Sequence, residues 1–364
     1  MSPLHATFSQ ATVIINPSRK PAYAHRLERM IREYGNPRII WTKSREHFLE
    51  EIAGFYSSDS EYLLVAGGDG TVHDAINTLM KLKQKSPAET MKSIGFFRGG
   101  SGNGYQDSYE IPEGVRQQVE TFVQAVENSH LIDVDLLKYT TPEETGFGQL
   151  AGTGFDAHVL YKREKKKIRR KNGRVVTKPG ILSYIAAILK TYILYNPLKS
   201  QQFNVAFQDG KYSYRGPRVN AEYPFDRLVR PSAPDMVEVG KRPYFAKQFK
   251  ICPDAVCNDG SLDAYLYSMK DKLKIVLHFL SLWNGWHDQI NFRYLEKGRP
   301  APIERYEVER VEISSSHPFH YHVDGELKET DKKIGDQYKL TIEIERSAIP
   351  FIVPYKFLRK FKPF

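Results

Sequence analysis

Cysteine is scarce in this sequence, which has two among its 364 residues. They stand near each other as Cys252 and Cys257, with no second pair of ligands close by, so a zinc site is not expected there. So few cysteines exclude a disulfide framework. Reduced thiols in a cytoplasmic protein are the simplest interpretation.

Long apolar runs are also missing. No stretch approaches the roughly 18 apolar residues that a membrane-spanning helix needs. The first residues, MSPLHATFSQATVIINPSRK, show no basic segment followed by an apolar core, and we expect no secretory signal. The length is enough for two domains, because single cores tend to divide beyond roughly 250–300 residues.

Acidic residues are outnumbered, with 43 Asp and Glu against 53 Lys and Arg, and the formal net charge is +10. This excess predicts an anionic partner, such as nucleic acid, a phosphorylated substrate or an acidic membrane. The basic residues are densest in residues 161–176, where a solvated loop is the usual meaning of such a run. Because the aromatic residues form no RNA-binding motif, nucleic acid is not favoured.

The first third of the chain alternates short apolar stretches with helical patterns. Strands are expected at residues 11–17, 37–42, 61–68 and from residue 93, and helices at residues 22–35, 45–58 and 72–84. Short buried strands that alternate with helices are typical of a parallel sheet covered on both faces. We therefore predict a Rossmann-like, three-layer α/β domain.

After about residue 132 the pattern changes to strands joined by turns, with one helical segment at residues 180–195. This part predicts a mostly antiparallel β domain. Residues 215–245 are rich in proline and are interpreted as irregular. The expected strands cover residues 132–139, 147–156, 202–209, 247–254, 262–269, 305–316, 319–326 and 338–346.

A glycine-rich turn, Gly67-Gly68-Asp69-Gly70-Thr71, joins the third strand to its helix. Glycines let the backbone approach phosphate oxygens, and a helix N-terminus offers unpaired N–H groups. Asp69 would repel bare phosphate, so it indicates a bound cation or a proton to be transferred. The alternative is a tight turn in which Asp69 or Thr71 caps the helix.

A second glycine-rich turn, from Arg98 to Gly104, follows the fourth strand. The carboxyl ends of parallel strands lie at one edge of the sheet, where open α/β sheets bind ligands. Asn16 after the first strand and Thr42 after the second would point to the same edge. Together these turns favour a nucleotide site.

Six motifs in this order resemble the diacylglycerol kinase catalytic family, which includes bacterial soluble lipid kinases and the sphingosine and ceramide kinases. The resemblance spans nearly the whole chain. It implies an α/β ATP-binding domain at residues 1–132, which residues 347–364 could complete. It further implies a C-terminal antiparallel β-sandwich domain for the lipid substrate at residues 133–346, and an active site in the cleft between the two. The motifs are INPSRK, AGGDGTVHDAIN, IGFFRGGSGNG, AGTGFDAHV, CNDGSLDAYL and YHVDGEL.

The family chemistry implies transfer of the γ-phosphate of ATP, with Mg2+, to the hydroxyl of diacylglycerol or a related lipid alcohol, a sphingoid base or ceramide. Asp69 would organise the phosphates and the catalytic Mg2+. Glu326 would accept the proton of the alcohol, with Asp324 beside it, since an alcohol is a poor nucleophile at neutral pH. The implied ATP contacts are Asn16, Thr42, Gly67, Gly68, Asp69, Gly70, Thr71 and Ser101.

The resemblance also implies a structural Mg2+, held by the carboxylate of Asp259 and by backbone oxygens of Val256 and Ser261. Asp-Gly between two strands is also a strong hairpin signal, so Asp324-Gly325 and Asp259-Gly260 could equally be turns.

Three features depart from the family pattern or stay open. The second turn has Arg98 and Gly104, where the family has a proline and an aspartate, and this change puts the acceptor substrate in doubt. Asp74 stands where a glutamate is usual. His320 and His322 share one face of a strand, so a metal pair is conceivable, although packing is favoured because no third ligand is evident.

Other functions compete with the lipid kinase. One is a small-molecule kinase that shares GGDGT, such as an NAD kinase; another is a non-catalytic nucleotide- or lipid-binding protein. A lipid kinase would meet its substrate at an anionic membrane surface, so we expect a cytoplasmic protein that associates peripherally with membrane. The basic cluster Lys165, Lys166, Lys167, Arg169 and Arg170, beside the apolar segment 180–195, could form that contact. The apolar segment could equally pack in the core of the second domain. The oligomeric state is left open, a homodimer included.

Overall fold

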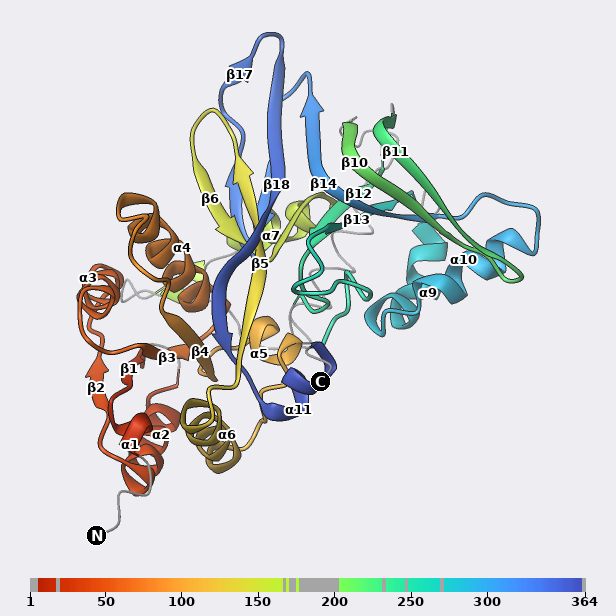
Figure 1. Cartoon of the computed structure of the whole chain (residues 1–364). Coiled ribbons are helices and arrows are strands. Elements are labelled where there is room, and N and C mark those ends of the chain that lie inside the picture. The colour runs from red at the N-terminus through yellow and green to blue at the C-terminus, as the bar shows by residue number, and fades with distance from the viewer. Residues whose placement is uncertain are drawn as a thin grey trace. The chain divides into compact units, whose positions relative to one another are not determined.

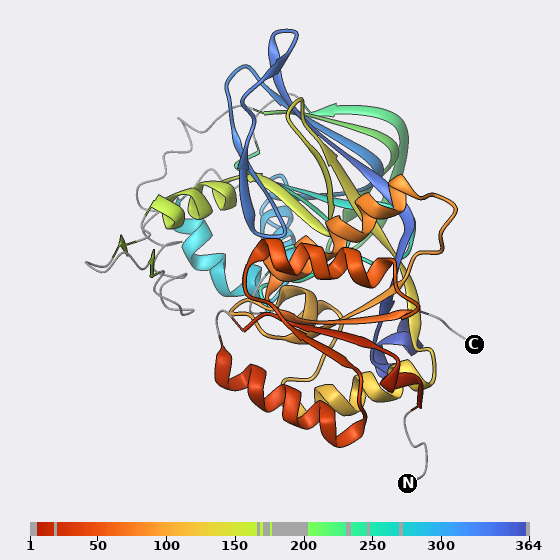
Figure 2. The ribbon, with the colours of Figure 1, turned by 90° about the vertical axis from the view of Figure 1, so that its left-hand side faces the viewer.

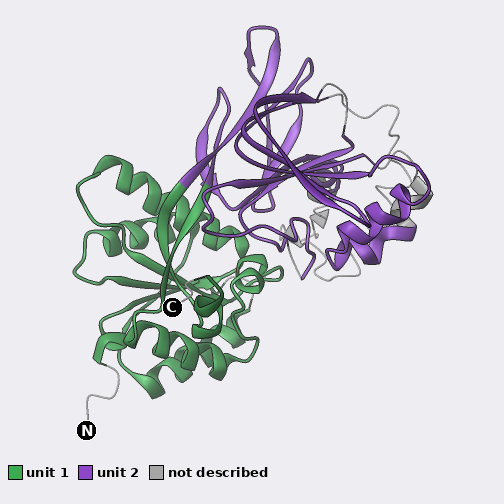
Figure 3. Cartoon of the chain, turned by 45° about the vertical axis from the view of Figure 1, so that its right-hand side comes forward, with its two compact units in different colours: residues 1–136, 346–364 green, residues 137–345 purple. Residues whose placement is uncertain are grey.

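The structure is a computed structural model, in which the chain divides into two compact units (Figure 3). Unit 1 comprises residues 1–136 and 346–364, and unit 2 comprises residues 137–345. The expected helix at residues 180–195 and the side chains of the basic cluster lie outside the described part. The structure describes residues 6–17, 20–165, 168–169, 175–176, 203–230, 234–245, 248–268 and 272–361.

Unit 1 is built on a parallel sheet (Figure 1). Its strand order is β18, β4, β3, β1, β2, and β1 pairs in register with both neighbours, so that Ile14 lies beside Ile40 and Val65. Apolar β-branched residues fill these strands because both faces of the sheet are covered. The strands are β1 (Thr12–Ile15), β2 (Arg38–Trp41), β3 (Tyr62–Gly67), β4 (Ser93–Arg98) and the last part of β18 (Gln337–Ile352).

Helices cover the sheet of unit 1 in two groups, which Figure 2 shows on either side of the strands. In α2, the buried residues Ala24, Leu27 and Ile31 recur at helical spacing and form one apolar face. Ser44 begins α3 by accepting a hydrogen bond from the backbone N–H of His47. One group is α1 (Ala6–Ser9), α2 (Pro21–Tyr34) and α6 (Val115–Glu127), and the other is α3 (Arg45–Tyr56) and α4 (Asp69–Lys85).

Two further helices belong to unit 1. They are α5 (Gly104–Ser108), which follows the second glycine-rich turn, and α11 (Tyr355–Phe361). The mixed α/β fold expected from the sequence is confirmed, and the predicted strands and helices of the first third are all present.

Unit 2 is mainly antiparallel. Its central strand β14 pairs with β13, β10 and β18, and the larger strands contribute to one apolar cluster. A second cluster lies beneath α7 (Phe155–Lys165) and α10 (His287–Leu295). Among the described residues of unit 2, the other helix is α9 (Lys272–Trp283).

The described strands of unit 2 follow one another along the chain between the two shared strands. β5 (Leu131–Thr140) and β18 continue from one unit into the other. Between them come β6 (Thr145–Gly148), β7 (Leu150–Gly154), β8 (Ile168–Arg169), β9 (Val175–Val176), β10 (Asn204–Arg215), β11 (Asn220–Arg230), β12 (Met236–Gly240), β13 (Leu262–Tyr267), β14 (Ile303–Ser315), β15 (His320–Val323), β16 (Glu326–Glu329) and β17 (Lys333–Ile334).

Two expectations for unit 2 are wrong. Much of the segment 215–245 is β-strand, because β11 bonds only to β10 among the described strands, and proline is tolerated on such an edge. Conversely, residues 248–254, the described part of the strand expected at 247–254, are not a strand. Ile251 and Cys252 are buried there, but the backbone joins no ladder beyond a single bridge from Lys250 to Tyr244.

No helix among the described residues is long and apolar enough to cross a membrane.

Candidate active site

The two glycine-rich turns of unit 1 pack directly against each other, backbone to backbone. A Cβ on Gly100 would lie 2.3 Å from the Cα of Gly68, and a Cβ on Gly99 would lie 2.8 Å from the Cα of Gly67. Only glycine permits such an approach. The turns therefore form one continuous surface of backbone at the carboxyl ends of β3 and β4.

Asp69 is the first residue of α4, and Gly68 is its N-cap. Thus neither Asp69 nor Thr71 is the cap, and that alternative is wrong. The backbone N–H of Tyr105 in α5 donates to Asp69 Oδ1 at 3.1 Å, which links the carboxylate to the second turn. A carboxylate in the first helical turn is favoured by the helix dipole.

Polar side chains from β1 and β2 lie at the same edge of the sheet. Asn16 Nδ2 donates to Thr71 Oγ1 at 3.2 Å, and the N–H of Asn16 donates to the carbonyl of Ala66. The Thr42 hydroxyl donates to the carbonyl of Ile15 at 3.3 Å. The structure therefore brings together the residues expected to contact ATP from four strand ends.

Arg98, the arginine that departs from the family pattern, is held by its own unit. Its Nη1 lies 2.7 Å from Asp107 Oδ1, and its Nε donates to the carbonyl of Ile111 at 2.8 Å. The side chain is 14% exposed. Its charge is thus largely neutralised by Asp107, and its main contacts hold α5 against β4.

The second turn, which includes Ser101, is closed by Asn103. The Asn103 Oδ1 accepts a hydrogen bond from the N–H of Gly100 at 3.0 Å. The backbone of Asn103 is left-handed, with φ of 60°. This is a conformation that asparagine tolerates. Backbone N–H groups in glycine turns at helix N-termini suit phosphate, and a carboxylate oxygen suits Mg2+. The residues of this edge therefore fit a Mg2+-nucleotide.

In unit 2, Asp324 and Gly325 form the two-residue turn of the β15–β16 hairpin. Both have positive φ, 52° and 85°, and Val323 pairs with Glu326 across the turn. This is the turn type that Asp-Gly favours. Glu326 is the first residue of β16 and is half-buried.

Asp324 is the buried counter-ion of Arg242. Arg242 Nη2 lies 3.2 Å from Asp324 Oδ1, and the two side chains are 1% and 0% exposed. The N–H of Gln149 donates to the same oxygen at 3.2 Å. Asp324 is therefore fixed in place beside the strand start that carries Glu326.

The segment that holds the two glycine-rich turns matches a known family model. Residues 10–139, which span the glycine turns, match the model of the diacylglycerol kinase catalytic domain. This segment is therefore similar to a diacylglycerol kinase catalytic domain.

Similarity to known proteins extends over most of the chain. Proteins of Yersinia pestis and Yersinia pseudotuberculosis, each named "Probable lipid kinase YegS-like", are 24% identical over 249 residues, which is 68% of this chain and 69% of theirs.

Solved structures show the same fold. A crystal structure of a diacylglycerol kinase from Bacillus anthracis gives a TM-score of 0.59 at 16% identity, covering 96% of this chain and 98% of the other. A second crystal structure from that organism gives a TM-score of 0.65 at 16% identity, covering 96% of each chain.

The structural Mg2+ that the diacylglycerol kinase family implies does not fit the residues as they lie. Lys241 Nζ lies 2.5 Å from Asp259 Oδ1 and 2.6 Å from the carbonyl oxygen of Ser261. Val256 lies in the same loop. An ammonium group therefore contacts two of the implied ligands.

A buried cluster of His322, Asp156 and Glu238 was missed, because its residues are far apart in the sequence. Three of their ligand atoms lie within 4.8 Å of one another, so they could hold a cation. Burial alone would lower the pKa of His322, but the two carboxyl groups raise it to about 10. Burial and the charge of Asp156 raise the pKa of Glu238, whereas the charge of His322 lowers that of Asp156 despite its burial. The cluster thus joins His322 to Asp156 as an ion pair, and the pKa of Glu238 beside them is held above its usual range.

The other histidine of this strand, His320, has packing contacts. His320 stacks on Tyr161, with ring centroids 4.3 Å apart, and lies 3.8 Å from Glu329. His320 therefore does not join the buried cluster that His322 makes.

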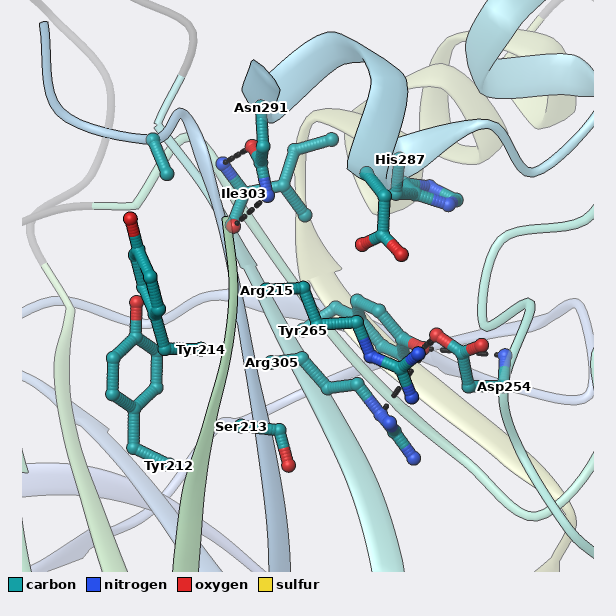
Figure 4. Close-up of a pocket in the computed structure, with 12 residues that line it drawn as sticks. Tyr212, Ser213, Tyr214, Arg215, Asp254, Tyr265, His287, Asn291, Ile303 and Arg305 are labelled. Carbon is teal, nitrogen blue, oxygen red and sulfur yellow. Dashed lines mark hydrogen bonds and ion pairs between the residues drawn. The ribbon is translucent and has the colours of Figure 1, made fainter. Parts of the chain in front are cut away.

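A small hollow in unit 2 is separate from the predicted site residues (Figure 4). Within it, Tyr265 donates to Asp254 at 2.9 Å, and the Asn291 side chain bonds to both backbone groups of Ile303. These polar groups satisfy one another, and none of the predicted site residues lines the hollow. Its lining is Tyr212, Ser213, Tyr214, Arg215, Asp254, Tyr265, His287, Asp288, Asn291, Ala301, Ile303 and Arg305.

Proposed function

We propose that this chain is an ATP-dependent lipid kinase that transfers the γ-phosphate to the hydroxyl of diacylglycerol or a related long-chain lipid alcohol, such as a sphingoid base or ceramide. The kinase class is supported by the family match of residues 10–139. The lipid class is supported by the names of the Yersinia relatives.

One observation carries the nucleotide part of the proposal. Two glycine turns meet so closely that no side chain fits between them, and Asp69 begins the helix that follows the first turn. Backbone N–H groups there would bind the phosphates, and Asn16 and Thr71 would contact the nucleotide beside them. The carboxylate of Asp69 would hold the Mg2+ that accompanies ATP, which neutralises charge on the phosphates.

Unit 2 supplies the proposed base. Glu326 would accept the proton of the lipid hydroxyl as its oxygen bonds to the γ-phosphorus and the bond from that phosphorus to ADP breaks. Asp324 would act as a positioning residue, since it is buried and paired with Arg242. The products are a phosphorylated lipid, ADP and one proton.

The lipid substrate implies a membrane surface. The net charge of +10 favours an anionic one, so we infer peripheral association with such a membrane and a cytoplasmic location. Charge reversal at Lys165, Lys166, Lys167, Arg169 and Arg170 should weaken co-sedimentation with anionic vesicles. Unchanged co-sedimentation would argue against this contact.

Glu326→Gln and Asp69→Asn are the decisive variants. Incubation with labelled ATP, Mg2+ and a panel of diacylglycerol, sphingoid base and ceramide should yield phosphorylated lipid with the natural protein. Each variant should lose about a hundredfold or more in rate, because general-base catalysis and charge neutralisation are each of this order. The rate of lipid phosphorylation is the measurement.

Glu329→Gln is the matched control, because Glu329 is an exposed glutamate on the same strand as Glu326. It should retain the rate of the natural protein. Product formation that survives both site variants would refute the assigned roles. Tight ATP binding without product from any lipid would support a binding protein instead, and phosphorylation of NAD would support the small-molecule kinase.

A further inference from the structure

We propose that Lys241 supplies the positive charge at the loop that the family pattern assigns to a structural Mg2+, so that this chain holds the loop without a divalent cation. The inference does not depend on the proposed activity, because it concerns the folding of unit 2.

The contacts of Lys241 resemble those of a bound cation. Its Nζ touches a carboxylate oxygen of Asp259 at 2.5 Å and a carbonyl oxygen of Ser261 at 2.6 Å. The N–H of Ser261 donates to the same Asp259 oxygen at 3.2 Å. One charged group thus ties both ends of the turn Asp259–Ser261 together, which is what a metal held by a carboxylate and a carbonyl would do.

The position of Lys241 is fixed by its backbone. It directly follows β12, and its N–H donates to the carbonyl of Gln149 at 2.8 Å. Its side chain is 0% exposed, whereas that of Asp259 is 32% exposed. A buried ammonium group without a partner costs free energy. Moving the Lys241 side chain away from these oxygens would therefore destabilise the folded state.

A divalent cation would compete with Lys241 for the same oxygens. Mg2+ needs ligands at about 2.0–2.1 Å in a near-octahedral arrangement. The other carboxylate of the motif is not available to complete it, because Asp263 is buried and lies 2.7 Å from Arg305 Nη2. Each carboxylate of the segment from Asp259 to Asp263 therefore already has a basic side chain beside it.

Arg242, the next residue along the chain, also forms a buried ion pair with an acidic turn. Arg242 pairs with Asp324 in the β15–β16 hairpin. The dipeptide Lys241-Arg242 therefore reaches two separate acidic turns, and both interactions are intramolecular. The shape of these turns is set by the chain itself.

Thermal unfolding of the full, nucleotide-free chain tests the proposal. The melting temperature of unit 2 should be the same in EDTA and in millimolar Mg2+ or Ca2+. Lys241→Met removes the ammonium and leaves the oxygens of Asp259 and Ser261. Its melting temperature should fall, and added Mg2+ or Ca2+ should raise it by about 3 °C or more, because a ligand that binds only the folded state stabilises it.

Two further variants test whether the response to a cation arises at the Asp259 loop or from the loss of any paired lysine. In Lys241→Met/Asp259→Asn, no carboxylate remains, so the cation should no longer raise the melting temperature. Lys339→Met is the matched control, because Lys339 pairs with a single carboxylate, Glu312, at 3.0 Å. It should gain no response to Mg2+ or Ca2+.

The natural chain alone can overturn the proposal. If EDTA lowers its melting temperature, Mg2+ restores it, and Asp259→Asn abolishes the response, a metal occupies the loop and Lys241 does not replace it. A Lys241→Met variant that folds but gains no response to either cation would also count against the proposal, since the vacated oxygens would then not be a cation site.

Discussion

At the scale of single residues, unit 2 pairs its buried charges within the chain. Arg242 meets Asp324, Lys241 meets Asp259, and Arg305 meets Asp263. Leaving one partner alone in the interior would cost several kcal/mol. The buried pairs therefore specify where the acidic turns lie, and most single replacements among them should destabilise the fold.

His287 tests how the burial of a titratable side chain affects the pH dependence of stability. It is 4% exposed, its Nε2 lies 3.0 Å from the Tyr267 hydroxyl, and burial lowers its pKa to about 4. In the unfolded chain its pKa is about 6.5, so the unfolded state binds the proton more tightly. The free energy of unfolding should therefore fall between about pH 6.5 and pH 4, by up to about 3 kcal/mol.

His287→Gln should remove that part of the pH dependence, as measured by urea unfolding from pH 8 to pH 4. The same replacement at His317, which is exposed, is the control and should leave the slope unchanged. If the curve of the His287 variant stays parallel to that of the natural protein, His287 is not the group responsible.

At the scale of elements, the two glycine turns are the most constrained backbone of unit 1. Each follows a strand of the parallel sheet, and they touch through Gly67, Gly68, Gly99 and Gly100. This contact sets the distance between the first turns of α4 and α5, which is where the nucleotide phosphates are proposed to bind.

Gly100→Ala should disrupt this contact, because its Cβ would lie 2.3 Å from the backbone of Gly68. The clash is with backbone atoms, which cannot move aside as a flexible side chain can. We therefore expect a loss of at least about 2 kcal/mol in the free energy of unfolding of unit 1. ATP affinity should fall as well. Chemical denaturation and titration with ATP are the two measurements.

Gly54→Ala is the contrasting change within the same unit. Gly54 lies in α3, and a Cβ there would meet no atom within 4 Å. Alanine should stabilise the helix by about 0.5–1 kcal/mol and leave ATP affinity unchanged. Equal effects of the two substitutions would contradict a steric origin for the loss at Gly100.

At the scale of the whole molecule, the end of the chain completes unit 1. Residues 346–364 belong to it, and Phe351 pairs with Ile94 of β4 in parallel. The Phe351 ring packs against Phe96 and Tyr109, with centroids 4.9 and 5.0 Å apart. The α/β unit is therefore closed only when the last strand has been made.

Phe351→Ala should destabilise unit 1 by about 3–5 kcal/mol, because it leaves a cavity among buried aromatic rings. Tyr355→Ala is the comparison, since Tyr355 lies in the same terminal segment and is 48% exposed. Calorimetry should show that only the first change strongly lowers the melting transition of unit 1. A small effect of Phe351→Ala would mean that the terminal strand is dispensable.

Prediction from sequence was best where the pattern was local. The β-branched run of β1, the glycine turn after β3 and the Asp-Gly hairpin at Asp324 were all found, because short-range periodicity and turn chemistry determine them. The boundary of α4 was missed by three residues. Asp69 already belongs to the helix, since glycine rather than a polar side chain provides the N-cap.

Prediction failed where a segment takes its structure from distant partners. The prolines of residues 215–245 predict an irregular segment, but β11 is held by its pairing with β10. Residues 247–254 are predicted to be a strand, but in the described part, 248–254, Ile251 and Cys252 pack into an apolar cluster and the backbone joins no ladder. The roles of the site residues stay predictions.

The sequence by itself determined the alternation of strands and helices, the place of the glycine turns at one edge of a parallel sheet, and the family resemblance. Only the tertiary structure decided which charges meet: Lys241 with Asp259, Arg242 with Asp324, and His322 with Asp156 and Glu238. The physical reason is the separation along the sequence of the residues that interact. Turns and periodicity depend on neighbours along the chain, whereas a buried ion pair depends on the register of strands that are remote in sequence.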